Sequence, residues 1–326
     1  MSLRHHPARW PPHLRAGALL LSALALASAC GPWLTADPTR ITDPRGAALL
    51  PPGASVLVFT LTSGATVAAE AARREESRWV ILRRGAEETL AVAEVTSVAP
   101  RRFWLGTDTV GRDVLARLLT GGRVSLSLGS LALLVALFVG ITTGLASGWY
   151  GGLLDAMLMR LVDAMLAIPT LFLLLLLAAV FRPSATALVV ALGLSSWMGV
   201  ARLVRAQVLS LKEREFSLAA RAIGAPPWRI AIVHLLPNTL TPLAQDAVLR
   251  LGDLILAEAA LSFLGLGVQP PTPSWGNMVA EGESLLMPAW WLTLIPGFAV
   301  AATVIGAALV AEGLRGVSRA ETSALA

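Results

Sequence analysis

The sequence predicts an all-α polytopic membrane protein with six transmembrane helices and a small β-element outside the membrane. Of its 326 residues, 55% are hydrophobic and only 14% are charged, whereas a soluble domain carries about 25% charged residues. The apolar residues fall in runs of roughly 20, the length that crosses a hydrocarbon core about 30 Å thick. One long polar interval instead contains short β-branched segments, which are typical of strands.

Six apolar runs have the length and the lack of charge expected of spanning helices. They are residues 16–34, 124–149, 164–181, 184–204, 240–263 and 289–310. Pro169 and Pro296 lie within two of these runs and are consistent with bends, which membrane helices tolerate when neighbours satisfy the freed backbone groups. Arg160 and Asp163 precede the third run, and their spacing predicts a local ion pair.

Arginine and lysine in the short loops set the orientation of a membrane protein. With the N-terminus in the cytoplasm, Arg202, Arg205, Lys212 and Arg221 lie inside, and Arg182 is an exception among short outer loops. We therefore expect a multi-pass membrane protein with both termini in the cytoplasm. The net charge of +5 then reflects contact with the lipid bilayer, and no nucleic-acid partner is expected.

The segment 35–104 would be a long extracytoplasmic loop. It contains "SVLVFTLT", "RWVILRR" and "TLAVAEV", which are short, β-branched and separated by glycine or charged residues. Such segments predict a small antiparallel element. Three strands are too few to predict an independently stable domain.

The first run contains Cys30, the only cysteine, so the sequence excludes an intrachain disulfide and a cysteine-based metal site. Its basic start, apolar core and small residues before Cys30 are also typical of a lipoprotein signal. Continuation of the apolar run to Leu34 favours an uncleaved first helix. A lipoprotein-like or structural membrane protein processed at Cys30 is the alternative.

Between the fourth and fifth runs lies a polar segment, residues 208–238, which we call the elbow. Residues 208–223 can form a helix with an apolar stripe that includes Phe216. Gly224 suits the left-handed position that ends a helix. Pro227 suits the first turn of a new helix near Trp228. We expect two short cytoplasmic helices at an angle.

The fifth run carries charges. Asp246, Arg250 and Asp253 project within about 60° of one another on a helix. Each would cost about 2.5–3.5 kcal/mol facing lipid, so this face must meet protein or water. Two interpretations stay open: a structural pairing of all three, or a lining of a translocation path or inner gate. Glu258 projects roughly 120° from Asp246 and belongs to a separate contact, at the gate or as an anchor.

No catalytic motif is present in the sequence. It contains no phosphate-binding loop, zinc-binding helix motif or nucleophile elbow, and three of its four histidines lie in the N-terminal tail. We expect a chain that is not an enzyme and that binds neither a metal nor a cofactor.

The elbow resembles the EAA loop of ABC importer permeases, which docks onto the ATPase subunit. In "AARAIGAPPWRIAIVHLLP" the family pattern is matched by Ala219, Ala220, Gly224, Leu236 and Pro237. Leu218 replaces the usual glutamate and His234 the usual isoleucine, so a salt bridge from that glutamate is not available. The resemblance implies ATPase coupling through these positions together with Phe216, Arg221 and Ala225.

Two further stretches resemble the dipeptide/oligopeptide/nickel type of permease, and specifically its second, C-type subunit. They are "LGTDTVGRDVLARLLTGGRVSL", from Leu105, and "LAEAALSFLGLGVQPPTPSWGNM", from Leu256. We expect Thr107 or Asp108 to cap a helix near Val110; contact with the pore mouth or a delivery protein is the alternative. The motif residues expected on the extracytoplasmic face are Gly106, Thr107, Asp108, Gly111, Arg112, Asp113, Pro270, Pro271, Trp275 and Gly276.

The resemblance implies an ABC type I importer permease core at residues 105–316. It follows a tail and first helix (1–34) and an extracytoplasmic segment (35–104), and it precedes a cytoplasmic tail (317–326). The implied assembly contains a homologous second permease, two ATP-binding subunits that hold ATP and magnesium, and an extracytoplasmic substrate-binding protein. Dipeptides, oligopeptides, nickel and other small solutes remain open as substrates. An ion-gradient-driven transporter or channel is the rival, although the paired repeats that it needs are not visible.

Overall fold

The computed structural model describes the backbone of residues 11–180 and 184–325, and the side chains of 11–176 and 184–316. The chain divides into two compact units. The helical unit comprises the residues up to Leu24, Leu126–Leu261 and those from Val300 onward. The sheet unit comprises Ala25–Ser125 and Ser262–Ala299.

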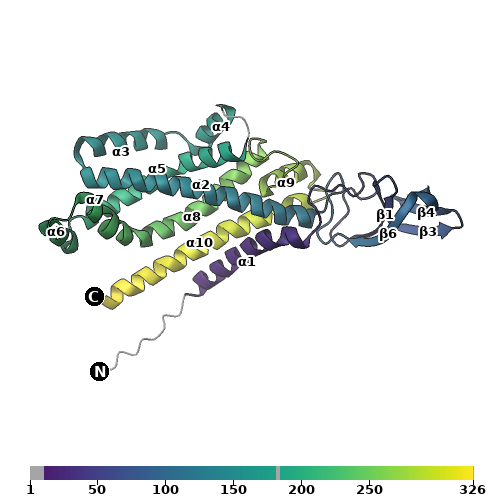
Figure 1. The fold of residues 1–326 in the computed structure, drawn as a ribbon, viewed down its shortest axis with the longest axis horizontal. Coiled ribbons are helices and arrows are strands. Elements are labelled where there is room, and N and C mark those ends of the chain that lie inside the picture. Colours follow the sequence, from purple (N-terminus) through teal and green to yellow (C-terminus); the bar gives the residue numbers. More distant parts are fainter. Residues whose placement is uncertain (1–10, 181–183, 326) are drawn as a thin grey trace, which may run out of the picture. The chain divides into compact units, whose positions relative to one another are not determined.

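Helices account for most of the chain outside the strands (Figure 1). They are α1 (Pro12–Leu34), α2 (Val114–Tyr150), α3 (Gly152–Leu166), α4 (Thr170–Val180), α5 (Ala185–Leu211), α6 (Glu215–Ala222), α7 (Pro227–Arg229), a π-helical segment (Ile230–Leu235), α8 (Leu236–Phe263), α9 (Trp275–Gly282) and α10 (Trp291–Leu325).

Four helices in the described part of the chain are long and apolar enough to cross a membrane. They are α1, α2, α5 and the Trp291–Gly316 part of α10, and the bent pair formed by α3 and α4 would add a fifth. Helix α8 has 28 residues, but its charged side chains exclude it from this apolar set. The count of six spans therefore stays a prediction.

The third expected span, residues 164–181, is not one helix. Helix α3 ends at Leu166, α4 begins at Thr170, and their axes differ by 88°. Pro169 explains the break, because a proline disfavours helical backbone at the preceding residue and donates no hydrogen bond of its own. The bend expected at this proline is confirmed, and it is large enough to divide the span.

Helices α2 and α5 pack closely through a glycine-based contact. Three glycines of α2 at four-residue spacing face three fully buried valines of α5, also at four-residue spacing. An added Cβ at each glycine would lie 2.5, 2.7 and 2.9 Å from the facing valine Cβ. The pairs are Gly140 with Val200, Gly144 with Val204, and Gly148 with Val208. Small residues at this spacing let two membrane helices approach backbone to backbone.

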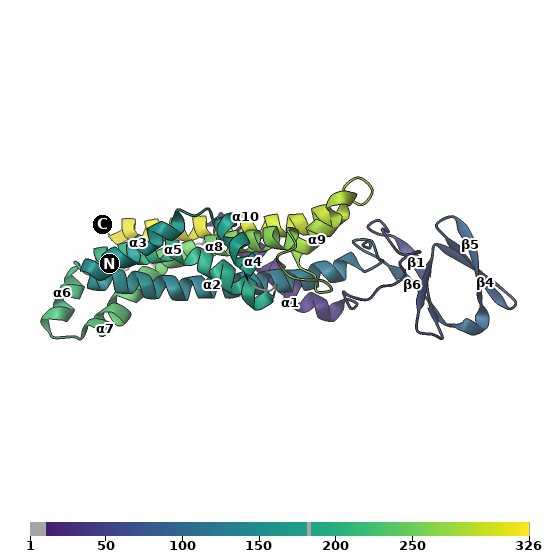
Figure 2. The same ribbon diagram turned by 90° about the horizontal axis from the view of Figure 1, so that it is seen from above.

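The sheet unit contains six strands in two antiparallel three-stranded sheets (Figure 2). The strands are β1 (Ser55–Leu61), β2 (Thr66–Ala69), β3 (Ala71–Glu75), β4 (Arg78–Arg83), β5 (Ala86–Ala91) and β6 (Val95–Arg102). Their orders are β2-β1-β6 and β3-β4-β5.

The two sheets share a small core. Phe59 of β1 and Ile81 of β4 are fully buried with Ala69, and the Phe59 ring meets that of Trp79 edge to face at 5.4 Å. The sequence predicted three strands here. It missed β2, β3 and β6 because they are rich in alanine and arginine or contain Pro100, which are poor local strand signals.

Candidate functional site

The elbow folds back on α5 and does not continue it. Residues 208–223 were expected to form one helix, but α5 ends at Leu211 and α6 begins at Glu215. Ala220 belongs to the same buried cluster as Val208. In one straight helix these residues, 12 positions apart, would be separated by about 18 Å, so burying Ala220 requires a turn.

Helix α6 ends at Ala222, and Gly224 takes the predicted left-handed position just after it, with φ +77°. The Gly224 amide donates to the Arg221 carbonyl, and the Ala225 amide donates to the Ala220 carbonyl, at 3.0 and 3.1 Å. This pair of bonds is a Schellman motif. Ala225 also packs against the buried cluster that contains Ala220, and an apolar contact at this position commonly accompanies the motif.

A second helix begins at Pro227, as predicted, but it is not a separate short helix. Helix α7 passes without a break into the π-helical segment and then into α8. Pro237 has no amide hydrogen, so the regular four-residue bonding cannot continue through it. The Asn238 side-chain amide donates to the His234 carbonyl at 2.6 Å. The wider π-helical turns therefore lie where proline interrupts the helix, and such turns are frequent at functional positions.

Apolar packing holds the elbow in place. Ile230 and Leu235 are buried in a cluster with Val204 of α5, and the Arg221 guanidinium lies over the Trp149 ring, 5.0 Å from its centroid. A cation over an indole face contributes about 0.5–1 kcal/mol at exposed sites. The elbow is thus fixed to α2 and α5 by its inner face.

The other face of the elbow exposes large apolar side chains. Ile223 is 86% exposed, Trp228 64% and Leu218 48%. The elbow also contains a hollow of about 620 Å³, which is lined by Leu211, Glu213, Arg214, Glu215, Phe216 and Asn238. Exposed apolar groups on a firmly packed segment are typical of a docking surface for another protein.

The charged residues of α8 do not form one pairing. Arg250 forms an ion pair with Asp246 and donates to the Ser196 carbonyl at 3.0 Å. Among the residues whose side chains the structure describes, Asp253 has no hydrogen-bond or ion-pair partner. The expected pairing of all three is therefore wrong at Asp253. Glu258 is fully buried, away from this group.

A cavity of about 400 Å³ lies beside Arg250 and Asp253. It is lined by residues of four helices: Leu166, Thr170, Ser195, Ser196, Gly199, Arg250, Asp253, Leu254 and Ala257. Leu166 and Thr170 flank the break between α3 and α4. Broken helices at membrane depth are tolerated where they line such a cavity.

Two ion pairs join α3 to α5. Asp155 accepts two hydrogen bonds of 2.6 Å from Arg205, and Asp163 pairs with Arg202. The expected local pair between Arg160 and Asp163 is wrong, because the facing helix supplies an arginine that reaches the same carboxylate. The sequence could not show this, since the partners are 39 and 50 positions apart.

In the 105–113 motif, the helix cap is Asp113. Its carboxylate accepts from the Leu115 amide at 2.9 Å, and α2 begins at Val114. The expectation that Thr107 or Asp108 caps a helix near Val110 is therefore wrong. Thr107 instead accepts from the Leu50 amide at 2.8 Å, and Asp108 accepts from Val110 and Arg112 amides within the loop.

Asp108 also belongs to a buried charge network. Arg117, whose side chain is 3% exposed, lies 2.6 Å from Asp108 and binds both carboxylate oxygens of Glu281 in α9. Arg112 pairs with the same two acids. Because Arg117 at the start of α2 donates two hydrogen bonds to Glu281 of α9, this network fixes α9 to the start of α2. The sequence analysis missed Arg117 and Glu281.

The remaining motif residues surround this network in the sheet unit. Trp275 is buried, and its indole N–H donates to the Leu118 carbonyl at 2.9 Å. Gly106 and Gly111 have positive φ and lie against backbone carbonyls, where a side chain would clash. Gly276 is buried in α9, whereas Pro270 and Pro271 are exposed in the loop before it.

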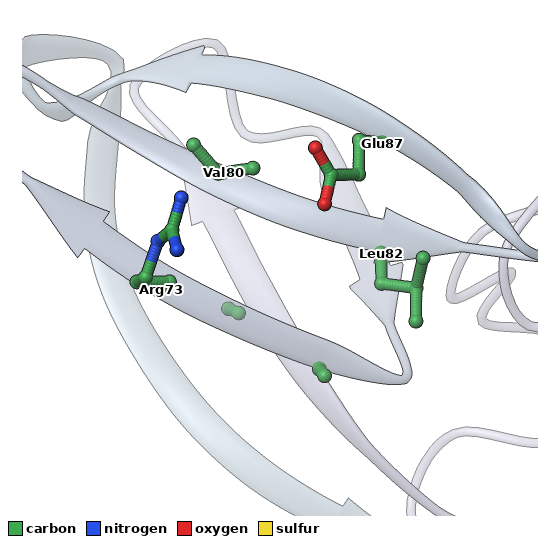
Figure 3. A pocket seen from close by; sticks show the side chains of 6 residues that line it. Arg73, Val80, Leu82 and Glu87 are labelled. Carbon is green, nitrogen blue, oxygen red and sulfur yellow. The ribbon is translucent and has the colours of Figure 1, made fainter.

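A shallower hollow of about 230 Å³ lies on the β3-β4-β5 sheet. Figure 3 shows Arg73 and Glu87 at its two sides, with Val80 and Leu82 between them. Ala71 and Ala72 complete its lining. These small side chains leave the hollow open.

The carboxylate Asp43 anchors the loop before β1. Burial alone would raise its pKa, but backbone hydrogen bonds from Ala68, Arg45 and Gly46, with a further bond from Arg83, lower the pKa below the ordinary 3.8. The hydrogen bond from the Ala68 amide to the Asp43 carboxylate is 2.9 Å long. Asp43 therefore stays ionised and connects this loop to β2 and β4.

Comparison with known proteins identifies the family. Residues 140–319 match the family of binding-protein-dependent transport system inner membrane components. The chain is 41% identical over 212 residues to the dipeptide transport system permease DppC of Alkalihalophilus pseudofirmus, covering 65% of this chain and 70% of that protein. It is 41% identical over 214 residues to the di/tripeptide permease DppC of Pseudomonas aeruginosa, covering 66% and 71%.

A more distant relative and one solved structure complete the comparison. The glutathione permease GsiD of Pectobacterium atrosepticum is 38% identical over 212 residues, with 65% of this chain and 70% of that protein covered. An inward-facing structure of the MetNI methionine ABC transporter covers 61% of this chain and 96% of its own, with 19% identity and a TM-score of 0.48.

The family match and the close relatives confirm the resemblance to dipeptide-type permeases and exclude the ion-gradient-driven alternative. The chain belongs to the binding-protein-dependent transport system inner membrane components, and it is a permease subunit of an ATP-driven importer.

Proposed function

We propose that this permease forms half of the translocation path for small peptides and that its elbow couples the path to a partner ATPase. Two of the relatives are named for dipeptides or di/tripeptides and a third for glutathione, itself a small peptide. A homologous permease completes the path, two ATP-binding subunits hold ATP and magnesium, and a substrate-binding protein delivers the peptide on the extracytoplasmic side. Both termini and the elbow lie in the cytoplasm.

The elbow carries this proposal. Its exposed apolar side chains Ile223 and Trp228 provide a surface for the ATPase. Its inner face is buried against α5 and is continuous with α8. A displacement of the elbow by the ATPase would therefore move α5 and α8 together, and α5 and α8 line the cavity beside Asp253.

The test is ATP-dependent uptake of glycyl-leucine by proteoliposomes that contain the assembled importer and its binding protein. The double variant I223E/W228E places two charges at side chains that are 86% and 64% exposed. We expect it to insert normally and to lose uptake at least tenfold. The matched control is I41E, which makes the same change at an isoleucine that is 48% exposed in the sheet unit.

Three results would count against the proposal. Absence of uptake by the parent assembly would refute the peptide assignment. Uptake that persists in I223E/W228E, or that falls equally in I41E, would refute coupling through the elbow.

A further inference from the structure

We infer that the cavity beside Asp253 is a subsite for the positively charged amino terminus of the peptide in transit. This inference rests on the proposed function, which supplies the peptide. It extends that proposal by assigning one chemical group of the substrate to one carboxylate of this chain.

The charges at the cavity do not cancel. Arg250 and Asp253 both line it. The charge of Arg250 is balanced by its ion pair with Asp246, and its guanidinium is further held by the Ser196 carbonyl. Asp246, Arg250 and Asp253 together carry one net negative charge, and the carboxylate whose charge is not balanced is that of Asp253.

Asp253 is also the exposed member of the group. Its side chain is open to the cavity, and among the described side chains it has no hydrogen-bond or ion-pair partner. An ionised side chain in a membrane helix is expensive unless it is paired or faces water, and for that reason it marks a functional pathway. A cation from outside the chain is the group that this position lacks.

The other lining residues suit an ammonium group. The hydroxyl-bearing residues Thr170, Ser195 and Ser196 line the same cavity, and a hydroxyl oxygen can accept a hydrogen bond from an ammonium N–H. Leu254 and Ala257 supply apolar wall, against which a small side chain of the peptide can lie. A free carboxylate is disfavoured there by the net charge.

The test places one reporter cysteine in the cavity. Ala257→Cys, made in the Cys30→Ala background, leaves this chain with a single thiol one turn from Asp253. In the detergent-purified assembly without binding protein, the modification rates by a cationic (aminoethyl) and an anionic (sulfonatoethyl) methanethiosulfonate are measured by intact mass of this chain. Each rate is divided by the rate of the same reagent with a free thiol.

In the parent we expect the cationic reagent to react about tenfold faster than the anionic one, equivalent to about 1.4 kcal/mol. In D253N the ratio of the two rates should be close to one. D253E keeps the charge and should keep the preference, which separates charge from folding. Glycyl-leucine should slow the cationic reaction at least fivefold, whereas N-acetylglycyl-leucine, which has no ammonium group, should not.

An unchanged ratio in D253N, or equal protection by both peptides, would overturn the inference. The inference would also fail if the parent showed no preference between the two reagents and the D253N assembly lost the second permease. That pair of results would show that a basic residue of the second permease pairs with Asp253. With any of these outcomes, the proposed function would still be supported if the parent assembly took up glycyl-leucine in an ATP-dependent way. Absence of that uptake would instead refute the proposed function.

Discussion

Gly224 offers a substitution whose cost can be worked out from the structure. Its φ is +77°, and among the residues that the structure describes no neighbouring atom lies within 4 Å of the position that a Cβ would occupy. Replacement by alanine therefore creates no clash, and its cost is conformational alone. An L-residue in left-handed backbone costs roughly 1–2 kcal/mol, and the reduced freedom of the unfolded chain returns about 0.4–1 kcal/mol. We expect G224A to weaken the end of α6 by about 1 kcal/mol, the difference between these figures.

The assay is hydrogen exchange by mass spectrometry on the assembled importer. A loss of about 1 kcal/mol corresponds to roughly fivefold more frequent opening, so peptides covering α6 and Ala225 should exchange roughly fivefold faster. Uptake should fall, because the elbow is then less firmly positioned. G224N should lose less, since asparagine tolerates left-handed backbone better than alanine.

Gly53 supplies the matched control for this substitution. Its φ is +83°, and no neighbouring atom in the described part of the chain lies within 4 Å of its Cβ position, but it lies in the turn before β1. G53A should show a similar local increase in exchange and no loss of uptake. Unchanged exchange in G224A would refute the conformational argument, and an equal loss of uptake in G53A would refute the link to coupling.

Three further outcomes follow from the same structure. G144V should destabilise the α2–α5 contact by about 1–3 kcal/mol through overpacking, because its Cβ would already lie 2.6 Å from the Ala201 carbonyl; an unchanged melting temperature would contradict that contact. D155N and R205Q should each lower the melting temperature. In a double-mutant cycle the interaction free energy of the pair should be about 1 kcal/mol, because the pair is partly exposed; additive effects would contradict the pairing. The lowered pKa of Asp43 means that its ionised form stabilises the fold above the ordinary carboxyl pKa, and that this contribution is lost as pH falls through the lowered value. Thermal unfolding followed from neutral pH down to pH of about 3 should therefore show a steeper acid-side loss in the parent than in D43N, and identical profiles would contradict the role of Asp43.

Local chemistry made parts of the elbow predictable. A glycine followed by two prolines can end one helix and begin another in few ways, and Gly224 and Pro227 occupy the expected positions. The fold-back of α6 was not predictable, because it depends on burial of Ala220 in one cluster with valines of α5. That contact is tertiary and leaves no periodic signal in the sequence.

The charged residues, too, were predictable where the interaction is local and not where it depends on tertiary contacts. Spacing along α8 indicated that Asp246, Arg250 and Asp253 share a face; in the structure Arg250 pairs with Asp246 and lines one cavity with Asp253. Spacing could not show that Arg205 and Arg202 of α5 would meet the acids of α3. Asp108 looked like a helix cap because the network that holds it is not local: Arg117 pairs with both Asp108 and Glu281, and Glu281 lies far away in the chain and is brought close only by the fold.

The helical spans show where composition is a sufficient guide and where it is not. Long apolar runs predicted α1, α2, α5 and α10, because no other environment suits such surfaces. Composition could not place the sharp bend at Pro169, since proline within a membrane helix is compatible with anything from a mild kink to a break. The missed strands carry alanine and arginine, whose strand-forming tendency comes from their neighbours in the sheet.

The most direct test of coupling through the elbow is retention of the ATPase by the purified permease pair. Membranes containing the parent, I223E/W228E or I41E are solubilised, the chain is captured by an affinity tag, and the bound ATPase is quantified. The account predicts that parent and I41E retain the ATPase stoichiometrically and that I223E/W228E loses at least nine-tenths of it (a tenfold change, about 1.4 kcal/mol) while still holding the second permease. Full retention by I223E/W228E would contradict it and would place the ATPase contact elsewhere on the chain.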